Sequence, residues 1–307
     1  MADLTGPHII AVRKALLLTN VNGYSGSMQA RLRGGLVVPE EQVIRVYVSK
    51  KVPAEALAAG ETIPREIEGT LVDVVATGEF QAQPGYTGRE RPVRGGWSVG
   101  NENSQATGTI GCIVSDGKWE GILSNNHVLA RCSNVEGHKA SPYEGILQPG
   151  ALDGGVFPND LVAMLTKWTD LSIRGVNRVD RAMALFTRDT PWGLAIEDMG
   201  LVRGVREAEV GLEVAKTGRT SGRLEGVVFD NNATLQVSYG QIIGAALEFE
   251  HQVLISPSIS IPGDSGSLIL SRERKAIGLL FAGSPAFTAC NHIADVLEGF
   301  GVEIVGA

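Results

Sequence analysis

Two short segments far apart in the chain carry residue types that could perform nucleophilic catalysis. The first, residues 262–267 (Pro-Gly-Asp-Ser-Gly-Ser), holds Asp264 and Ser265 between two glycines and lies between the apolar runs Val253–Ile255 and Leu268–Leu270. Glycine lets the backbone turn sharply, so successive N–H groups can converge in front of the Ser265 hydroxyl, where an oxyanion would develop. Taken alone, this segment is equally well explained as a glycine turn between two strands.

A histidine far upstream favours the catalytic interpretation. His127 lies in the polar turn of residues 124–130 (Ser-Asn-Asn-His-Val-Leu-Ala), which follows a strand-like run. Imidazole titrates near neutrality, so His127 could take a proton from Ser265 and return it to a leaving amine. The sequence therefore predicts an acyl-transfer site of the kind that cleaves peptide bonds. The remaining histidines lack such surroundings and are interpreted as structural or solvated: His8, His138, His251 and His292.

An aspartate that orients the histidine should complete the site, and two residues compete for this role. Asp160 and Asp180 each precede an alternating apolar run, so local pattern does not separate them. In a first barrel of six strands, residues 160–167 would form the fifth strand and residues 181–187 the sixth. The orienting acid should lie where the last strand begins, beside the histidine turn, and this favours Asp180.

The elements that must position these residues are short strands separated by glycine-rich turns. From residue 105 to residue 307 the even spacing predicts β-barrels or sandwiches rather than βαβ units. Asn291 is expected to cap a closing helix that ends at Glu298. The expected strands are 108–114, 119–124, 143–148, 160–167, 181–187, 211–216, 223–229, 233–238, 245–256, 267–271 and 276–282.

Residues 1–79 are expected to form a small α/β unit, and the stretch 80–104, rich in Pro, Gly and Arg, is expected to be a linker. The runs 43–48 and 70–75 are typical of strands, and residues 53–59 of a short helix. Residues 9–18 fit a helix or a strand equally well.

Composition excludes several classes of function. A net charge of −7 disfavours a nucleic-acid partner, because phosphate binding requires clustered Lys and Arg. No stretch has the roughly 18–20 apolar residues of a membrane span, so no membrane association is expected. The three cysteines (Cys112, Cys132 and Cys290) are odd in number and at no metal-binding spacing, which favours a reducing compartment, interpreted as the cytoplasm. Neither a metal nor another cofactor is expected.

The order His, Asp, Ser, with the motifs Asn-Asn-His-Val-Leu-Ala, Val-Asp-x-Ala and Gly-Asp-Ser-Gly, resembles the chymotrypsin/trypsin-like serine proteases. Within that superfamily, the chain is similar to the narrow-leaf-type proteases of plants and bacteria. It shares with them the segment 214–222 (Val-Ala-Lys-Thr-Gly-Arg-Thr-Ser-Gly). The resemblance implies a mainly β fold of two six-stranded barrels over residues 105–307, after the small α/β region. It also implies a serine endopeptidase that works through an acyl-enzyme intermediate on a polypeptide substrate.

By the same resemblance, Ser265 is the nucleophile, His127 the general base and acid, and Asp180 the orienting carboxylate. The N–H groups of Gly263 and Ser265 would form the oxyanion hole. Ile259 stands where trypsins place an acid at the base of the substrate pocket, so specificity for Arg or Lys is not expected. The pocket residues implied are Ile259, Phe281, Ala282 and Gly283, which indicate a modest apolar pocket.

Activation by cleavage is not expected. Arg94 is followed by Gly95-Gly96-Trp97, and two glycines could not fill the apolar pocket that receives a new N-terminus in many trypsin-like enzymes. Asp264 should therefore pair with a side chain or N–H group of the barrel, and the intact chain should be competent.

A competing interpretation is a catalytically silent trypsin-like scaffold that binds peptides. The intact Ser-His-Asp set argues against it, and labelling of Ser265 by a fluorophosphonate would discriminate the two. An esterase of the α/β-hydrolase class requires the order Ser, acid, His, which this chain lacks. Whether the chain forms a homo-oligomer is left open by the sequence.

Overall fold

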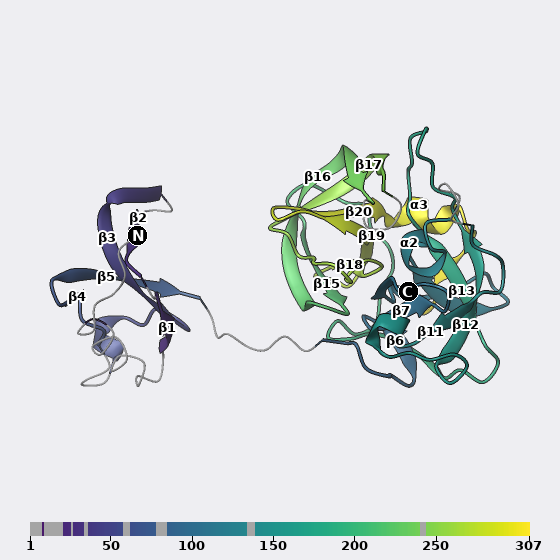
Figure 1. Ribbon diagram of the computed structural model, residues 1–307, viewed down its shortest axis with the longest axis horizontal. Coiled ribbons are helices and arrows are strands. Elements are labelled where there is room, and N and C mark those ends of the chain that lie inside the picture. The colour runs from purple at the N-terminus through teal and green to yellow at the C-terminus, as the bar shows by residue number, and fades with distance from the viewer. Residues whose placement is uncertain are drawn as a thin grey trace. The chain divides into compact units, whose positions relative to one another are not determined.

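The computed structural model describes residues 8, 21–25, 27–33, 36–57, 62–77, 85–133, 139–239 and 244–307. The chain divides into two compact units, Met1–Ala82 and Gln83–Ala307. Each unit folds around its own strands (Figure 1). No helix in these described ranges is long and apolar enough to cross a membrane.

The first unit is built on a five-stranded sheet. Its order is β1-β3-β5-β4, and β2 pairs with β3. The expected strands 43–48 and 70–75 lie in β3 and β5, which pair in parallel. The expected helix at 53–59 begins as the 3₁₀ turn η1, whereas residues 58–61 and 9–18 lie outside the described residues. The elements are β1 (Val21–Tyr24), β2 (Gln29–Arg33), β3 (Leu36–Val48), η1 (Ala54–Ala56), β4 (Glu66–Ile67) and β5 (Thr70–Ala76).

The first half of the second unit is one sheet that curls on itself. Its strand order is β21-β9-β10-β13-β12-β11-β7-β8. β8 ends at Thr109 and β9 begins at Cys112, so strands near opposite ends of the sheet are joined by two residues. A sheet with this connection must bend round into a barrel-like form. Its strands are β7 (Ser98–Asn101), β8 (Thr107–Thr109), β9 (Cys112–Ser115), β10 (Glu120–Ser124), β11 (Gly145–Leu147), β12 (Leu161–Trp168), β13 (Ala182–Phe186) and β21 (Glu303–Ile304).

The second half is a closed six-stranded barrel, in the order β15-β16-β17-β20-β19-β18. Figure 1 shows its green and yellow strands around a common centre, beside the teal strands of the first half. Its strands are β15 (Glu213–Gly218), β16 (Gly222–Ser238), β17 (Ala246–Ser256), β18 (Leu268–Ser271), β19 (Ala276–Gly283) and β20 (Thr288–His292). The remaining elements of this unit are β6 (Val93–Gly95), α2 (Asn126–Leu129), η2 (Ala151–Asp153), β14 (Trp192–Ile196) and α3 (Ile293–Glu298).

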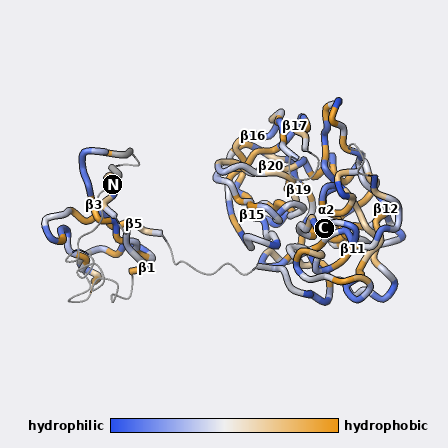
Figure 2. Tube along the Cα trace, in the orientation of Figure 1, coloured by the Kyte–Doolittle hydropathy of each residue, from blue (hydrophilic) through white to orange (hydrophobic). Residues whose placement is uncertain are grey.

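Each half has its own apolar core, and a third core joins them. Ile122 and Leu165 lie in the core of the first half, and Val253 and Ile277 in that of the barrel. The joining core combines strands of both halves with Ile293 of α3, so the closing helix holds the halves together. Figure 2 shows the hydrophobic segments following the strands and the polar ones at the outer turns.

Two expectations about element bounds are corrected by the structure. Residues 85–104, expected as linker, carry β6 and β7, and β7 pairs with β8 and β11 inside the second unit. The closing helix begins one residue later than expected: Asn291 belongs to β20, and His292 is the N-cap of α3.

Candidate active site

The loop of residues 262–267, which carries Ser265, turns at two glycines that no other residue could replace without strain. Gly263 has φ +100° and Gly266 has φ +97°, a left-handed backbone conformation that side chains disfavour. A Cβ at Gly263 would also collide with Arg219 and Thr220, and one at Gly266 with Ser124. The glycines flanking Asp264 and Ser265 are therefore required by both backbone conformation and space.

The loop presents two N–H groups that are left without acceptors. Within the described residues, the N–H groups of Gly263 and Ser265 donate to no hydrogen bond. Neighbouring N–H groups are paired: Asp264 donates to Ile261 O at 3.1 Å, Gly266 to Leu280 O at 2.8 Å and Ser267 to Asp264 O at 3.1 Å. An oxyanion hole requires N–H donors that are free to bind the oxyanion, and these two N–H groups meet that condition.

The carboxylate of Asp264, adjacent to Ser265, is buried and paired with Lys216 of β15. The Lys216 Nζ to Asp264 Oδ2 distance is 2.9 Å, and both side chains are 0% exposed. Lys216 also donates to Ser221 Oγ and to Gly222 O, so all three ammonium hydrogens have acceptors. Burial lowers the pKa of Lys216, and Asp264 partly offsets that effect. The other donors to Asp264 are Ser221 Oγ at 2.5 Å and the N–H groups of Ile261, Thr220 and Ser221 at 3.0–3.1 Å.

The expectation that Asp264 has an internal partner is therefore confirmed. The segment 214–222, singled out as a motif, supplies Lys216 and most of the other donors. A newly cut N-terminus has no place at this carboxylate, because its oxygens already accept five hydrogen bonds.

Replacing Lys216 by methionine is expected to lower the free energy of unfolding by about 3–5 kcal/mol, because Asp264 would remain buried without a countercharge. Chemical denaturation of the purified variants measures this change. Lys118→Met, at an exposed lysine, is the matched control and should shift stability by less than about 0.5 kcal/mol. Equal stability of the two variants would show that the Lys216–Asp264 ion pair does not stabilise the loop of residues 262–267.

His127 is held against Asp180 by a buried pair of hydrogen bonds. Asp180 Oδ2 lies 2.6 Å from His127 Nδ1, and the main-chain N–H of His127 donates to Asp180 Oδ1 at 3.2 Å. The Asp180 side chain is 0% exposed. Asn125 Nδ2 donates to Asp180 O at 2.7 Å, and the Asp180 N–H donates to Asn291 Oδ1 at 3.0 Å, so the backbone beside the carboxylate is fixed.

Burial alone raises the pKa of Asp180, but the charge of His127 and hydrogen bonds from His127 and Tyr239 outweigh it and hold that pKa below its usual value. Asp180 is therefore a carboxylate at neutral pH, as an orienting residue must be.

The competing aspartate, Asp160, lies in a different place. Its Oδ2 accepts from the Val156 N–H at 3.0 Å, and its Oδ1 lies 3.2 Å from Arg89 Nε. It therefore closes a turn before β12 and makes no hydrogen bond to His127. Strand counting chose the aspartate that meets the histidine.

Thr109 of the first half connects the serine loop to the histidine turn. Its N–H donates to Ser265 O at 2.7 Å, and its hydroxyl donates to Gly263 O at 2.9 Å. Its carbonyl accepts from Ser124 Oγ at 2.7 Å, three residues before His127. A Cβ at Gly108 would meet both Val128 and Ser265 O, so the loop and the turn approach closely at this glycine.

The hydroxyl of Ser265 lies 3.5 Å from Phe281 O, which is a long contact, and it makes no hydrogen bond to His127 in the structure. Catalytic hydrogen bonds are often long or poorly aligned without substrate. The structure thus brings Ser265 near the histidine turn and leaves the roles of the three residues as predictions.

A cavity of about 670 Å³ opens beside His127. Phe281, Ala282 and Gly283 line it as expected, but Ile259 does not. Ile259 is 1% exposed and belongs to the barrel core with Val228 and Ile255. The other lining residues are Leu235, Gln236, Val237, Ser238, Tyr239, Leu254, Pro262, Ser284, Phe287 and Ala289. The wall from Leu235 to Tyr239 was not predicted.

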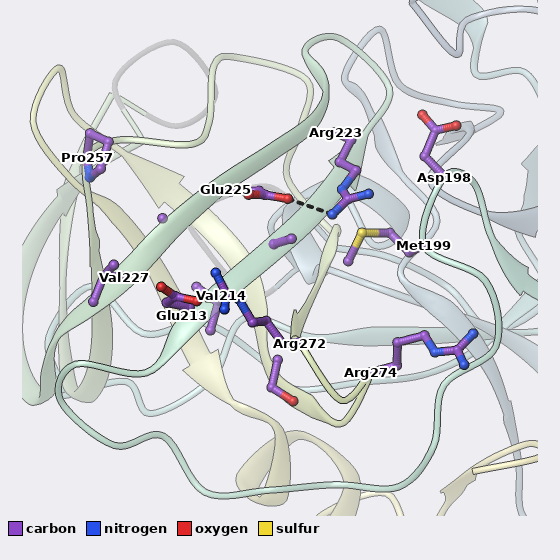
Figure 3. Close-up of a pocket in the computed structure, with 13 residues that line it drawn as sticks. Asp198, Met199, Glu213, Val214, Arg223, Glu225, Val227, Pro257, Arg272 and Arg274 are labelled. Carbon is purple, nitrogen blue, oxygen red and sulfur yellow. Dashed lines mark hydrogen bonds and ion pairs between the residues drawn. The ribbon is translucent and has the colours of Figure 1, made fainter.

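A second cavity, of about 570 Å³, lies along β15, β16 and the turn after β18 (Figure 3). Its lining includes several Arg, Asp and Glu side chains, and Arg223 donates to Glu225, two residues along β16, at 2.6 Å. It contains none of Ser265, His127 and Asp180, so it does not belong to the candidate active site.

A closed six-stranded barrel beside a curled sheet, with the paired His127 and Asp180 on the first half and Ser265 on the second, is the architecture of the chymotrypsin-like double β-barrel. This is the fold of the trypsin-like serine proteases, and the chain has it.

Three solved bacterial-type proteases illustrate the likeness. Thermobifida fusca Protease A matches at 18% identity and TM-score 0.50, over 70% of this chain and 99% of that one. Nocardiopsis protease matches at 16% identity and TM-score 0.50, over 69% and 98%. A glutamic-acid-specific serine protease that uses a histidine triad in substrate binding matches at 18% identity and TM-score 0.50, over 69% and 100%. No family model and no curated protein sequence matches the chain.

Proposed function

We propose that this chain is a serine endopeptidase in which Ser265, His127 and Asp180 form the catalytic triad. The observation that carries the proposal is the pair of unpaired N–H groups, on Gly263 and Ser265, in a loop tied by Thr109 to the turn that holds the His127–Asp180 pair. Neither a simple glycine turn nor a peptide-binding scaffold requires two unpaired donors beside a serine.

The proposed reaction has two halves. His127 Nε2 takes the proton of Ser265 as Oγ attacks the substrate carbonyl, and the N–H groups of Gly263 and Ser265 stabilise the oxyanion. His127 then gives that proton to the leaving amine, which leaves an acyl-enzyme on Ser265. In the second half His127 takes a proton from water as the water oxygen attacks the acyl carbon. The bond from that carbon to Ser265 Oγ then breaks, the carboxylic acid product leaves, and His127 returns the proton to Oγ. Asp180 fixes the imidazole tautomer and stabilises the imidazolium throughout.

Labelling by a fluorophosphonate tests this function directly. The probe should form a covalent bond with Ser265 in the full chain, and peptide mass spectrometry should locate it there. The intact mass should show that the labelled chain is uncut between residues 80 and 105, as the internal Lys216–Asp264 pair leads us to propose. Absence of label at Ser265 under conditions that label trypsin would favour the catalytically silent scaffold.

We further propose that the cavity beside His127 receives an apolar side chain next to the scissile bond. Among the residues that the structure describes, its lining contains no Asp, Glu, Lys or Arg and His127 is its one histidine, so no carboxylate or ammonium there would pair with a charged substrate residue. The Phe287 ring in the lining contacts the exposed Phe229 ring in a tilted arrangement, with 5.0 Å between the ring centroids and 51° between the planes, which extends the apolar surface outward.

Peptides identical except for the residue before the scissile bond should be cleaved at least about 10-fold faster, in kcat/KM, with Phe or Leu than with Lys or Arg. The reason is that an ammonium or guanidinium in this cavity would lose water without gaining a partner. Competition of the peptides in one reaction, read by mass spectrometry, measures the ratio. A preference for Lys or Arg would mean that the cavity is not the specificity pocket.

The cytoplasm is our proposal for the site of action. All three cysteines are buried and unpaired, which fits a reducing compartment.

A further inference from the structure

The extended hairpin of β16 and β17 brings a phenol to the buried carboxylate of the candidate triad. Tyr239, directly after β16, donates its hydroxyl to Asp180 Oδ2 at 2.6 Å. The same oxygen accepts from His127 Nδ1, also at 2.6 Å. Tyr239 is 5% exposed, and Asp180 is fully buried, so both groups depend on protein partners rather than on water.

Ring contacts fix the phenol in this position. The Tyr239 ring lies 5.7 Å from the His127 ring, edge to face at 78°. It stacks on Phe249 of β17 at 6.2 Å and 24°, and its N–H donates to Ala245 O at 2.8 Å. Phe249 in turn packs at 4.7 Å on Phe281, which lines the substrate cavity with Tyr239. The hydroxyl is thus held at Asp180 by a packed set of aromatic rings.

A structural role for the ring alone would not need the hydroxyl. Phenylalanine serves in the same apolar cluster at Phe249 and Phe281. A buried hydroxyl without an acceptor is destabilising, and at this position Asp180 Oδ2 supplies the acceptor. Burial and the charge of Asp180 raise the pKa of Tyr239, and the phenol therefore remains a donor at every pH at which the protein could work.

We propose that Tyr239 is a positioning residue of the active site: its hydroxyl, shared with His127 on Asp180 Oδ2, orients the carboxylate and moderates its basicity toward the imidazole. The proposal rests on the proposed function of the triad. In the part of the chain that the structure describes, the titratable groups facing Asp180 are His127, Tyr239 and the Cys132 thiol. Burial raises the pKa of Cys132 far above neutrality, so this thiol stays uncharged.

The charge on Asp180 determines how loss of the Tyr239 hydroxyl would change the protonation of His127. Without the Tyr239 hydroxyl, more of the carboxylate's negative charge is available to His127, and this stabilises the imidazolium. The neutral imidazole, which is the general base, would then form only at higher pH.

Tyr239→Phe should therefore move the acid limb of the kcat/KM profile upward by about one pH unit and lower kcat about 10-fold, since hydrogen bonds to charged groups are the stronger ones. KM should change less than about two-fold. Tyr143→Phe is the matched control: Tyr143 is 74% exposed, and its substitution should leave the profile unchanged. A Tyr239→Phe profile that overlays the wild-type profile would overturn the proposal.

A second measurement does not depend on turnover. NMR titration of ¹⁵N-labelled histidine in the full chain should give a higher midpoint for His127 in Tyr239→Phe than in the wild type. 3-Fluorotyrosine at position 239, a stronger donor of nearly the same size, should lower that midpoint. If the wild type proves inactive, the proposed function fails while this titration still decides the role of Tyr239. Equal midpoints in all three proteins would rule that role out.

Discussion

Replacing Ser265 by alanine is expected to lower kcat for peptide hydrolysis by about 10⁶-fold while the fold remains intact. The alanine lacks the atom that forms the acyl-enzyme, and the N–H groups of the loop alone should leave only about 10³-fold catalysis over water. Stability should hardly change, because the hydroxyl makes a single long contact, 3.5 Å from Phe281 O. Hydrolysis of a peptide with an apolar residue before the scissile bond gives the first quantity, and thermal unfolding gives the second.

Ser258→Ala provides the control for this variant. Ser258 precedes the loop of residues 262–267, and its hydroxyl makes comparably long contacts, 3.5 Å to Ser260 O and 3.4 Å to Thr288 Oγ1. It does not line the cavity, and turnover should stay within about two-fold of the wild type. Undiminished turnover in Ser265→Ala would place the nucleophile elsewhere in the chain.

Several strands were predictable because their apolar runs are short and lie between turn residues. The runs 160–167 and 181–187 correspond to β12 and β13, and this correspondence allowed Asp180 to be chosen over Asp160. The pattern was less informative where the backbone departs from regular pairing. Residues 223–229 and 233–238 are predicted as two separate strands. The structure keeps them in one strand, β16, with register shifts between Val228 and Leu235.

The sequence alone did not predict which side chains from distant segments contact each other in the site. The partner of Asp264 was expected to be internal, but the choice of Lys216 needs the barrel, where β15 passes beneath the loop. Tyr239 carried no signal at all, since it follows an ordinary alternating strand and meets Asp180 only through folding of the hairpin. Ile259 was assigned to the pocket by position relative to Ser265, and packing in the barrel core overrode that assignment.

Asp180→Asn is expected to lower kcat by about 10⁴-fold. Both carboxylate oxygens accept hydrogen bonds: Oδ1 from the main-chain N–H of His127, and Oδ2 from His127 Nδ1–H and the Tyr239 hydroxyl. An amide NH₂ in either position faces a donor. If it faces His127 Nδ1, that nitrogen must become the acceptor and the imidazole takes the tautomer in which Nε2 carries the proton and cannot accept one from Ser265. If the amide NH₂ faces the main-chain N–H of His127, the two donors repel each other and residues 127 and 180 move apart.

Asp160→Asn is the matched variant for this comparison. Asp160 accepts from the Val156 N–H and lies beside the exposed Arg89, and an amide oxygen can still accept the first of these bonds. Turnover of Asp160→Asn should therefore stay within about two-fold of the wild type, measured on the same peptide at a pH above the acid limb. A loss in Asp160→Asn with Asp180→Asn unaffected would mean that the buried pair at 2.6 Å is structural and that another carboxylate orients the histidine during catalysis. The Asp180→Asn variant also lacks the carboxylate that stabilises the imidazolium, so His127 should be a poor base in it. Activity of Asp180→Asn should therefore be recovered in part at high pH, where hydroxide can replace His127 as the base.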